Sequence, residues 1–133
     1  MDKKDSRIVT FMLGDMTFEY DDEKNQKNIE KHGISFKSAA RIFFDYDRIE
    51  YYDEENSDYE DRFDTIGDLS AGTMNLSNNS DILIGNIGKD DVLFVVYTER
   101  IKKNENGKDI DVTRIISARY ATNFERGLYY GKY

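Results

Sequence analysis

Residues 92–100 read V-L-F-V-V-Y-T-E-R, and after a polar loop residues 113–130 read T-R-I-I-S-A-R-Y-A-T-N-F-E-R-G-L-Y-Y; these two runs decide the fold. Apolar, β-branched runs of this kind are typical of sheet strands. Each run ends on an arginine, Arg100 or Arg119. Because strands in a sheet are spaced about 4.8 Å apart, we expect the two guanidinium groups on one face, within about 10 Å of each other, where they bind one anion.

The two arginines are the first candidates for a functional site. Arginine carries a planar, permanently charged fork that matches a phosphate, and such a group also stabilises the extra charge of a phosphoryl transition state. The alternative is that each arginine forms a surface salt bridge, with Glu99 or Glu125 as partner. Glu99 has two open roles of its own, a general base or a group that orients Arg100.

Further candidates flank these runs. His32 ends a predicted helix beside Lys31, and a helix C-terminus favours the charged imidazolium. His32 is therefore either a general acid or phosphate contact, or a helix-end cap. Tyr97 and Tyr120 are expected either to stack on an RNA base or to pack in the core or at its rim. Arg126 is a further candidate for contact with RNA.

Composition excludes several classes of site. The chain has no cysteine and one histidine, which excludes disulfides, thiolate zinc sites, cysteine nucleophiles and histidine-rich metal sites. The acidic run at residues 53–61 lacks the ligand spacing of a calcium loop, so a solvated turn is expected there. We therefore expect no cofactor and no metal.

Length and charge bound the class of protein. The 133 residues fit one domain. The N-terminus has no apolar core of a signal peptide, and no apolar run approaches the roughly 20 residues that cross a bilayer, so a cytoplasmic protein is expected. The net charge of −8 argues against a nucleic-acid partner. However, residues 92–133 carry eight Lys/Arg and five Asp/Glu, a local +3 that coincides with the candidate site.

The remaining pattern predicts an α+β fold. Asp21 or Asp22 caps a polar helix that runs to about Lys31, with Gly33 after its end; its polar stripe Asn25, Asn28, Ile29 and His32 is either solvated or part of a site. Ser35 caps an amphipathic helix whose core-facing residues are Phe36, Ala39, Ala40, Phe43 and Phe44. Thr122-x-x-Glu125 predicts a capping box and a short last helix. Strands are expected at Ile8–Leu13, Met16–Tyr20, Arg48–Tyr52, Arg62–Gly67, Ile82–Ile87, Val92–Tyr97 and Ile110–Ala118, with loops at 68–80 and 102–108.

Blocks of sequence in a fixed order resemble one known family. They are F-E-Y-D (18–21), E-K-N-x-x-N-x-x-K-H-G-I-S-F-x-x-A (23–39), R-F-x-x-I-G (62–67), V-V-Y-T-E-R (95–100), R-I-I-S-A-R (114–119) and A-T-x-x-E-R (121–126). Together they resemble the BrnT-type toxins over most of the chain.

The resemblance implies a fold and a function. BrnT proteins are the toxin half of a type II toxin–antitoxin pair, with a RelE-like fold: two N-terminal helices packed on an antiparallel sheet, and a short C-terminal helix. They cleave RNA without a metal, and their partner BrnA is a DNA-binding antitoxin that covers the toxin and represses the shared operon. The resemblance places the functional residues on Arg100 and Arg119, with Glu99, Lys31 and His32 as weaker candidates.

The sequence departs from the family in three places. Tyr20 stands where the family has tryptophan, and the chain is unusually acidic for an RNA-cleaving enzyme. Residues near 68–81 look like an inserted loop or hairpin within a single domain, 1–133. An alternative function is therefore a catalytically inactive toxin-fold module that serves as an antitoxin partner or co-repressor; an unrelated α+β scaffold is a second.

The same residues predict a mechanism and an interface. A ribose 2′-OH attacks its own phosphate, the arginines hold the developing charge, and His32, Lys31 or Glu99 moves protons. An antitoxin is expected to dock on residues 92–133, near Arg100, Arg119 and Arg126. Its apolar anchors are Phe124, Leu128, Tyr129 and Tyr130, unless these side chains only pack the last helix on the sheet.

Overall fold

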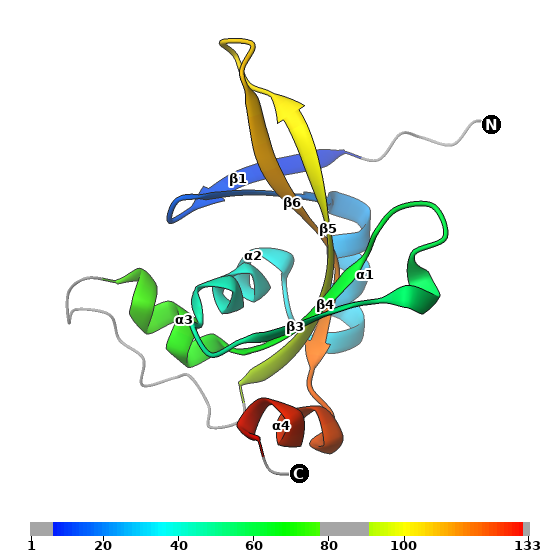
Figure 1. Cartoon of the computed structure of the whole chain (residues 1–133), viewed down its shortest axis with the longest axis vertical. Coiled ribbons are helices and arrows are strands. Elements are labelled where there is room, and N and C mark those ends of the chain that lie inside the picture. The colour runs from blue at the N-terminus through cyan, green and yellow to red at the C-terminus, as the bar shows by residue number, and fades with distance from the viewer. Residues whose placement is uncertain (1–6, 78–90, 132–133) are drawn as a thin grey trace.

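The computed structural model describes residues 7–77 and 91–131, which form the predicted α+β fold (Figure 1). Within these residues one six-stranded sheet has the order β1-β2-β6-β5-β4-β3. Its strands are β1 (Ile8–Leu13), β2 (Met16–Asp21), β3 (Ile49–Tyr52), β4 (Phe63–Asp68), β5 (Val92–Lys103) and β6 (Asp109–Tyr120).

The sheet is not wholly antiparallel, so that part of the prediction is wrong. Strands β2 and β6 run parallel, whereas the other four neighbouring pairs are antiparallel. A parallel pair needs a long connection, and the helices and strands between β2 and β6 provide one. Alternation along single strands does not reveal the direction of a partner so far away in the chain.

The helices begin and end close to where their caps predict. They are α1 (Asp22–His32), α2 (Phe36–Ala39), α3 (Leu69–Leu76) and α4 (Asn123–Tyr130), with 3-10 turns η1 (Ala40–Phe44) and η2 (Glu54–Asn56). The predicted caps Asp21, Gly33, Ser35 and the Thr122–Glu125 capping box are confirmed. In the described part of the chain, no helix is long and apolar enough to cross a membrane.

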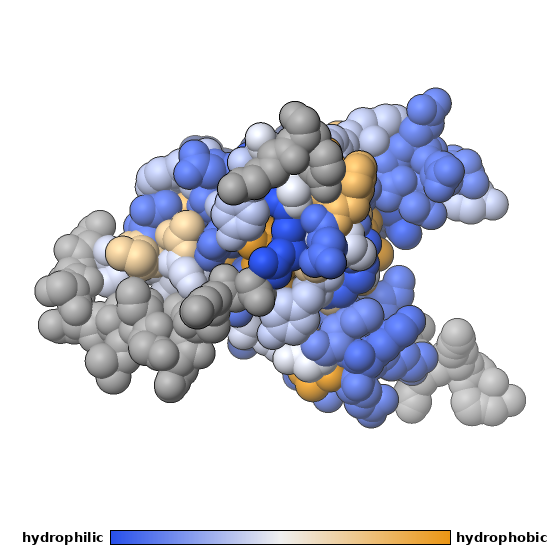
Figure 2. All heavy atoms as spheres, turned by 90° about the horizontal axis from the view of Figure 1, so that it is seen from below, coloured by the Kyte–Doolittle hydropathy of each residue, from blue (hydrophilic) through white to orange (hydrophobic). Residues whose placement is uncertain are grey.

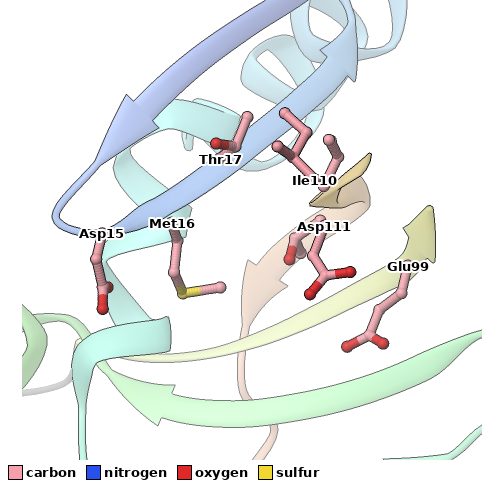
Figure 3. A pocket seen from close by; sticks show the side chains of 8 residues that line it. Asp15, Met16, Thr17, Glu99, Ile110 and Asp111 are labelled. Carbon is pink, nitrogen blue, oxygen red and sulfur yellow. The ribbon is translucent and has the colours of Figure 1, made fainter. Parts of the chain in front are cut away.

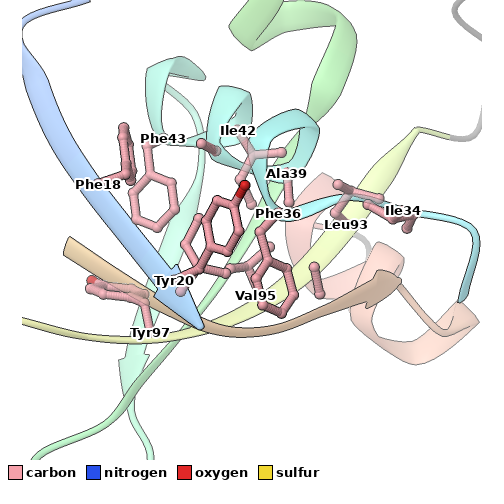
Figure 4. Packing of buried hydrophobic residues seen from close by; sticks show 13 residues of the cluster. Phe18, Tyr20, Ile34, Phe36, Ala39, Ile42, Phe43, Leu93, Val95 and Tyr97 are labelled. Atoms are coloured by element: carbon pink, nitrogen blue, oxygen red, sulfur yellow. The ribbon is translucent and has the colours of Figure 1, made fainter. Parts of the chain in front are cut away.

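One face of the sheet carries the main core. The predicted amphipathic helix is confirmed only in part: the segment forms the short helix α2 and then the 3-10 turn η1, which place the expected core residues Phe36, Ala39 and Phe43 against the sheet (Figure 4). Phe43 packs edge-on to Tyr97 with ring centroids 5.0 Å apart. We call this side, which carries Leu93, Val95 and Tyr97, the core face. The opposite side, which carries Phe94, Val96 and Arg119, is called the outer face.

The loop predicted at residues 68–80 is wrong over Leu69–Leu76, which form α3. Asp68 caps this helix by accepting hydrogen bonds from the backbone N–H groups of Ser70 and Ala71. Gly72 lies so close to η1 that a Cβ there would overlap the carbonyl oxygen of Arg41. The glycine that weakens the helix locally therefore permits its close packing. The predicted strand at 82–87 lies outside the described residues.

The polar stripe of α1 has a structural role. The Asn28 side chain donates to the carbonyl oxygen of Ala118 at 2.8 Å and accepts from its N–H at 3.2 Å. Strand β2 pairs with β6 only at Val112–Arg114. Further along β6, at Ala118, the Asn28 side chain takes the place of a neighbouring strand. Asn25 accepts from the N–H of Phe36 at 2.8 Å. These two buried amides fix α1 against the sheet and against α2.

Candidate active site

Arg100 and Arg119 lie at opposite ends of the β5–β6 pair. Arg100 is opposite Val112, and Arg119 is opposite Phe94. The seven steps along β6 from Val112 to Arg119 span about 23 Å at a rise of ~3.3 Å per residue. The predicted shared anion site is therefore wrong. Two consecutive antiparallel strands end at opposite ends of their hairpin, and β5 continues to Lys103 instead of ending at Arg100.

Each arginine is already paired with a carboxylate. Arg119 donates through Nη1 and Nη2 to Glu125 at 2.8 and 2.9 Å, so the salt bridge expected under the alternative interpretation is present. Its guanidinium also lies 4.2 Å from the centre of the Phe94 ring. Arg100 donates to Glu60 at 2.9 Å. Both arginine side chains remain 35% exposed, so an anion from solvent can still reach either one.

Arg119 lies within a cluster of titratable side chains on the outer face. Asp64 is opposite Val96 on one neighbour and Tyr51 on the other, so its side chain lies on the same side of the sheet as Arg119. We call the set the outer-face cluster: Tyr51, Asp53, Asp64, Arg119 and Glu125. It joins β3, β4, β6 and α4 at one end of the molecule.

Charge and burial shift the pKa values in this cluster. Burial, and then the neighbouring Asp53, raise the pKa of Asp64 to about 7, against the opposing charge of Arg119. Burial, Glu125 and Asp64 raise the pKa of Tyr51. The hydrogen bonds to Glu125 raise the pKa of Arg119, so the guanidinium stays charged. The cluster therefore combines a fixed cation with a carboxyl group that changes protonation near neutral pH.

Helix α4 is held over this end of the sheet by a buried carboxylate. The Tyr129 hydroxyl donates to Asp45 at 2.6 Å, and Asp45, which is 1% exposed, also accepts from the N–H of Asp68 at 2.7 Å. Phe124 and Tyr130 remain 61% and 47% exposed. Figure 2 looks at the end of the molecule that carries α4, where strongly hydrophilic atoms lie beside hydrophobic ones. An apolar and charged surface of this kind suits a macromolecular partner.

Glu99 lies on the other side of the sheet from Arg100, because successive side chains of a strand alternate. It borders a hollow of about 550 Å³ together with the carboxylates of Asp15 and Asp111 (Figure 3). None of the residues that line this hollow is basic. A neighbouring hollow of about 500 Å³ contains Arg100 with four acidic residues. The charge of these two hollows disfavours a phosphate.

The other candidates are dispersed. Tyr97 is 4% exposed and stacks on Phe63 with ring centroids 5.5 Å apart, so the core alternative is confirmed and the ring cannot reach an RNA base. Tyr120 is 51% exposed on the strand end beside Arg119. Arg126 is partly buried on α4.

Lys31 and His32 end α1, one helical turn beyond Asn28, which bonds to Ala118 next to Arg119. Lys31 is exposed and His32 is half-buried. They therefore belong to the same end of the sheet as Arg119, in contrast to Glu99 and Arg100. Sequence patterns missed Asp64, Asp53 and Tyr51; Asp64 is one of the unspecified positions in R-F-x-x-I-G.

Comparison with known proteins finds a similarity over part of the chain. Residues 20–77 match the family model described as the ribonuclease toxin BrnT of type II toxin–antitoxin systems. No curated protein sequence matches the chain. The matched segment includes Tyr51, Asp53 and Asp64, and Arg119 lies beyond it. Residues 20–77 are therefore similar to the BrnT family of ribonuclease toxins of type II toxin–antitoxin systems.

Proposed function

We propose that the chain is a metal-independent endoribonuclease that cleaves RNA to inhibit translation and growth, and that a BrnA-type antitoxin neutralises it. The family match supports a ribonuclease toxin with an antitoxin partner. The observation that carries the catalytic part is Arg119, a partly exposed guanidinium on the outer face beside a carboxyl group with a pKa of about 7. A phosphate binder next to a proton-transfer group is what RNA cleavage requires.

The proposed reaction starts with attack of a ribose 2′-OH on the adjacent phosphate, so DNA is not a substrate. Arg119 binds the phosphate oxygens and stabilises the charge that develops on them. Before RNA binds, Glu125 holds the Arg119 guanidinium in a fixed orientation through two hydrogen bonds. The phosphate then takes the place of Glu125. Lys31 and His32 remain candidates for proton transfer at this end of the sheet. Arg100, about 23 Å away by strand geometry, binds a distant part of the same RNA strand, and Tyr120 and Arg126 contact the bases or phosphates near Arg119.

Purified protein free of antitoxin is expected to degrade single-stranded RNA in the presence of EDTA and to leave DNA of the same sequence intact. The reason is that the chain has no cysteine and one histidine, whereas the arginine chemistry needs no metal. Cleavage is followed on a gel with end-labelled substrates. Arg119→Ala protein, prepared identically, controls for a contaminating nuclease. Loss of cleavage in EDTA would contradict the metal-independent mechanism.

The antitoxin is expected to dock on residues 92–131 and to cover Arg119. Here the exposed Phe124 and Tyr130 are the apolar anchors, whereas Tyr129 is held internally by Asp45. Hydrogen exchange with and without antitoxin should show protection over this segment. Phe124→Ala should weaken binding by tenfold or more, about 1.4 kcal/mol, and Met12→Ala, which removes an equally exposed side chain from β1, should not. Protection confined to residues 7–60 would rule out this docking mode.

The second candidate function is an inactive toxin-fold module that binds the antitoxin as a co-repressor. It is favoured by the fact that Arg100 and Arg119 each have a carboxylate partner within the chain. The RNA assay separates the two functions, because an inactive module binds antitoxin without cleaving RNA.

A further inference from the structure

We infer that Asp64 is the catalytic group that accepts the proton of the ribose 2′-OH beside Arg119. The inference rests on the proposed ribonuclease function and adds to it a residue that no sequence motif indicates. It starts from the position and the incomplete pairing of this carboxyl group.

Asp64 lies in the middle of β4, with a neighbouring strand on each side. Its side chain projects from the outer face, like those of Tyr51 and Arg119. The residue as a whole is half-buried. Its Oδ1 atom is buried and has no hydrogen-bond partner among the described residues. Burying an unpaired carboxylate oxygen opposes folding, so packing alone gives no reason for an aspartate here.

Charged groups from three other segments of the chain act on Asp64. Asp53, which follows β3, and Glu125 on α4 both favour its protonated form, and Arg119 on β6 favours its charged form. A proton on Asp64 is also shared in a hydrogen bond with Asp53. With burial as the largest cause, these effects raise its pKa to about 7. A general base is most effective when its pKa lies near the working pH.

The proposed step balances with water as the second participant. With a phosphate bound at Arg119, ionised Asp64 takes the proton of the 2′-OH while the 2′ oxygen bonds to phosphorus. The bond from phosphorus to the 5′ oxygen breaks, and that oxygen takes a proton from water. Asp64 then returns its proton to the hydroxide left behind. The products are a 2′,3′-cyclic phosphate and a free 5′-hydroxyl, and the substrate is single-stranded RNA, whose 2′-OH is free to align.

The test is a pH profile of kcat/KM on single-stranded RNA between pH 5 and 9. The wild-type rate is expected to rise with pH and to level off above about 7. Asp64→Asn, which keeps the shape but cannot accept the proton, should lose at least ~100-fold at pH 8 and lack the rising limb. The Asp53→Asn variant should keep cleaving RNA, but the rising part of its pH profile should move to lower pH. The reason is that loss of the neighbouring negative charge lowers the pKa of Asp64. Asp58→Asn, on the exposed loop before β4, should match wild type.

Thermal unfolding separates catalysis from folding. The pKa of Asp64 is raised in the folded protein above its ordinary value of 3.8, so ionisation destabilises the fold as pH rises from about 4 to 7. Asp64→Asn should therefore raise Tm at pH 8 relative to wild type, and have little effect at pH 4. If Asp64→Asn does not fold, Asp53→Asn decides, and an unchanged limb in that variant overturns the inference.

The outcomes distinguish the two proposals. Wild-type protein without RNA cleavage at any pH would overturn the ribonuclease function itself. Active wild-type protein with an equally active Asp64→Asn variant, or with a rising limb that persists in that variant, would overturn the role of Asp64 alone.

Discussion

Arg119→Ala is expected to reduce kcat/KM for RNA cleavage by at least about 100-fold, the effect of removing one stabiliser of transition-state charge. Arg119 is the arginine that shares a sheet face and an end of the molecule with Asp64. Its bidentate partner Glu125 shows that the guanidinium fork is already oriented for two oxygens of one group. Single-turnover cleavage of a short RNA measures the loss.

Two matched variants make this result specific. Arg119→Lys keeps the charge but not the fork, so it should recover only part of the rate. Arg100→Ala removes an arginine of equal exposure, 35%, whose position is about 23 Å from Arg119 by strand geometry. It is expected to cost less than ~10-fold, mainly in KM, as for a peripheral phosphate contact. A larger loss in Arg100→Ala than in Arg119→Ala would move the active site to the hairpin end of β5 and β6.

Asp45→Ala is expected to lower the free energy of unfolding by about 3 kcal/mol, the largest stability effect among these variants. The side chain is 1% exposed and accepts hydrogen bonds from the Tyr129 hydroxyl and from the N–H groups of Asp47 and Asp68. Truncation leaves buried donors without an acceptor and releases α4 from η1. Urea unfolding at neutral pH measures the change.

Two further substitutions serve as controls for the loss of stability in Asp45→Ala. Tyr129→Phe removes one of the three bonds and should cost about 1–2 kcal/mol. Asp47→Ala removes an exposed side chain and should stay within about 0.5 kcal/mol of wild type. Equal stability of Asp45→Ala and wild type would mean that solvent satisfies these donors, and that α4 is held by other contacts.

Local rules explain why much of the fold is predictable. Asp21, Ser35 and Thr122 each accept backbone N–H groups within the next three residues, so the information lies within one turn of helix. The helix α3 was missed for the opposite reason. Its Ser/Asn/Gly-rich sequence disfavours a helix locally, and packing of Gly72 against η1 overrides that preference.

The candidate active site was only partly predictable because it depends on strand register. Arg119, and Glu125 as its alternative partner, follow from sequence spacing of six residues. The separation of Arg100 from Arg119 depends on where β5 turns into β6, and the position of Asp64 depends on pairing with both β3 and β5. Such long-range pairing sets which face a side chain occupies, and no single segment of the sequence contains it.

The bridge between Arg119 and Glu125 gives the site its own internal counterion. A protein that binds RNA through free cations releases ions from the nucleic acid, and its affinity falls steeply with salt. In the proposed reaction an incoming phosphate takes the place of Glu125, which now pairs with Arg119, and Glu60 is the corresponding partner of Arg100. Stray anions must displace a carboxylate that is already in place. Under the proposed function, RNA displaces these carboxylates because its successive phosphates compete along the strand, and this would reconcile an acidic chain with a polyanionic substrate.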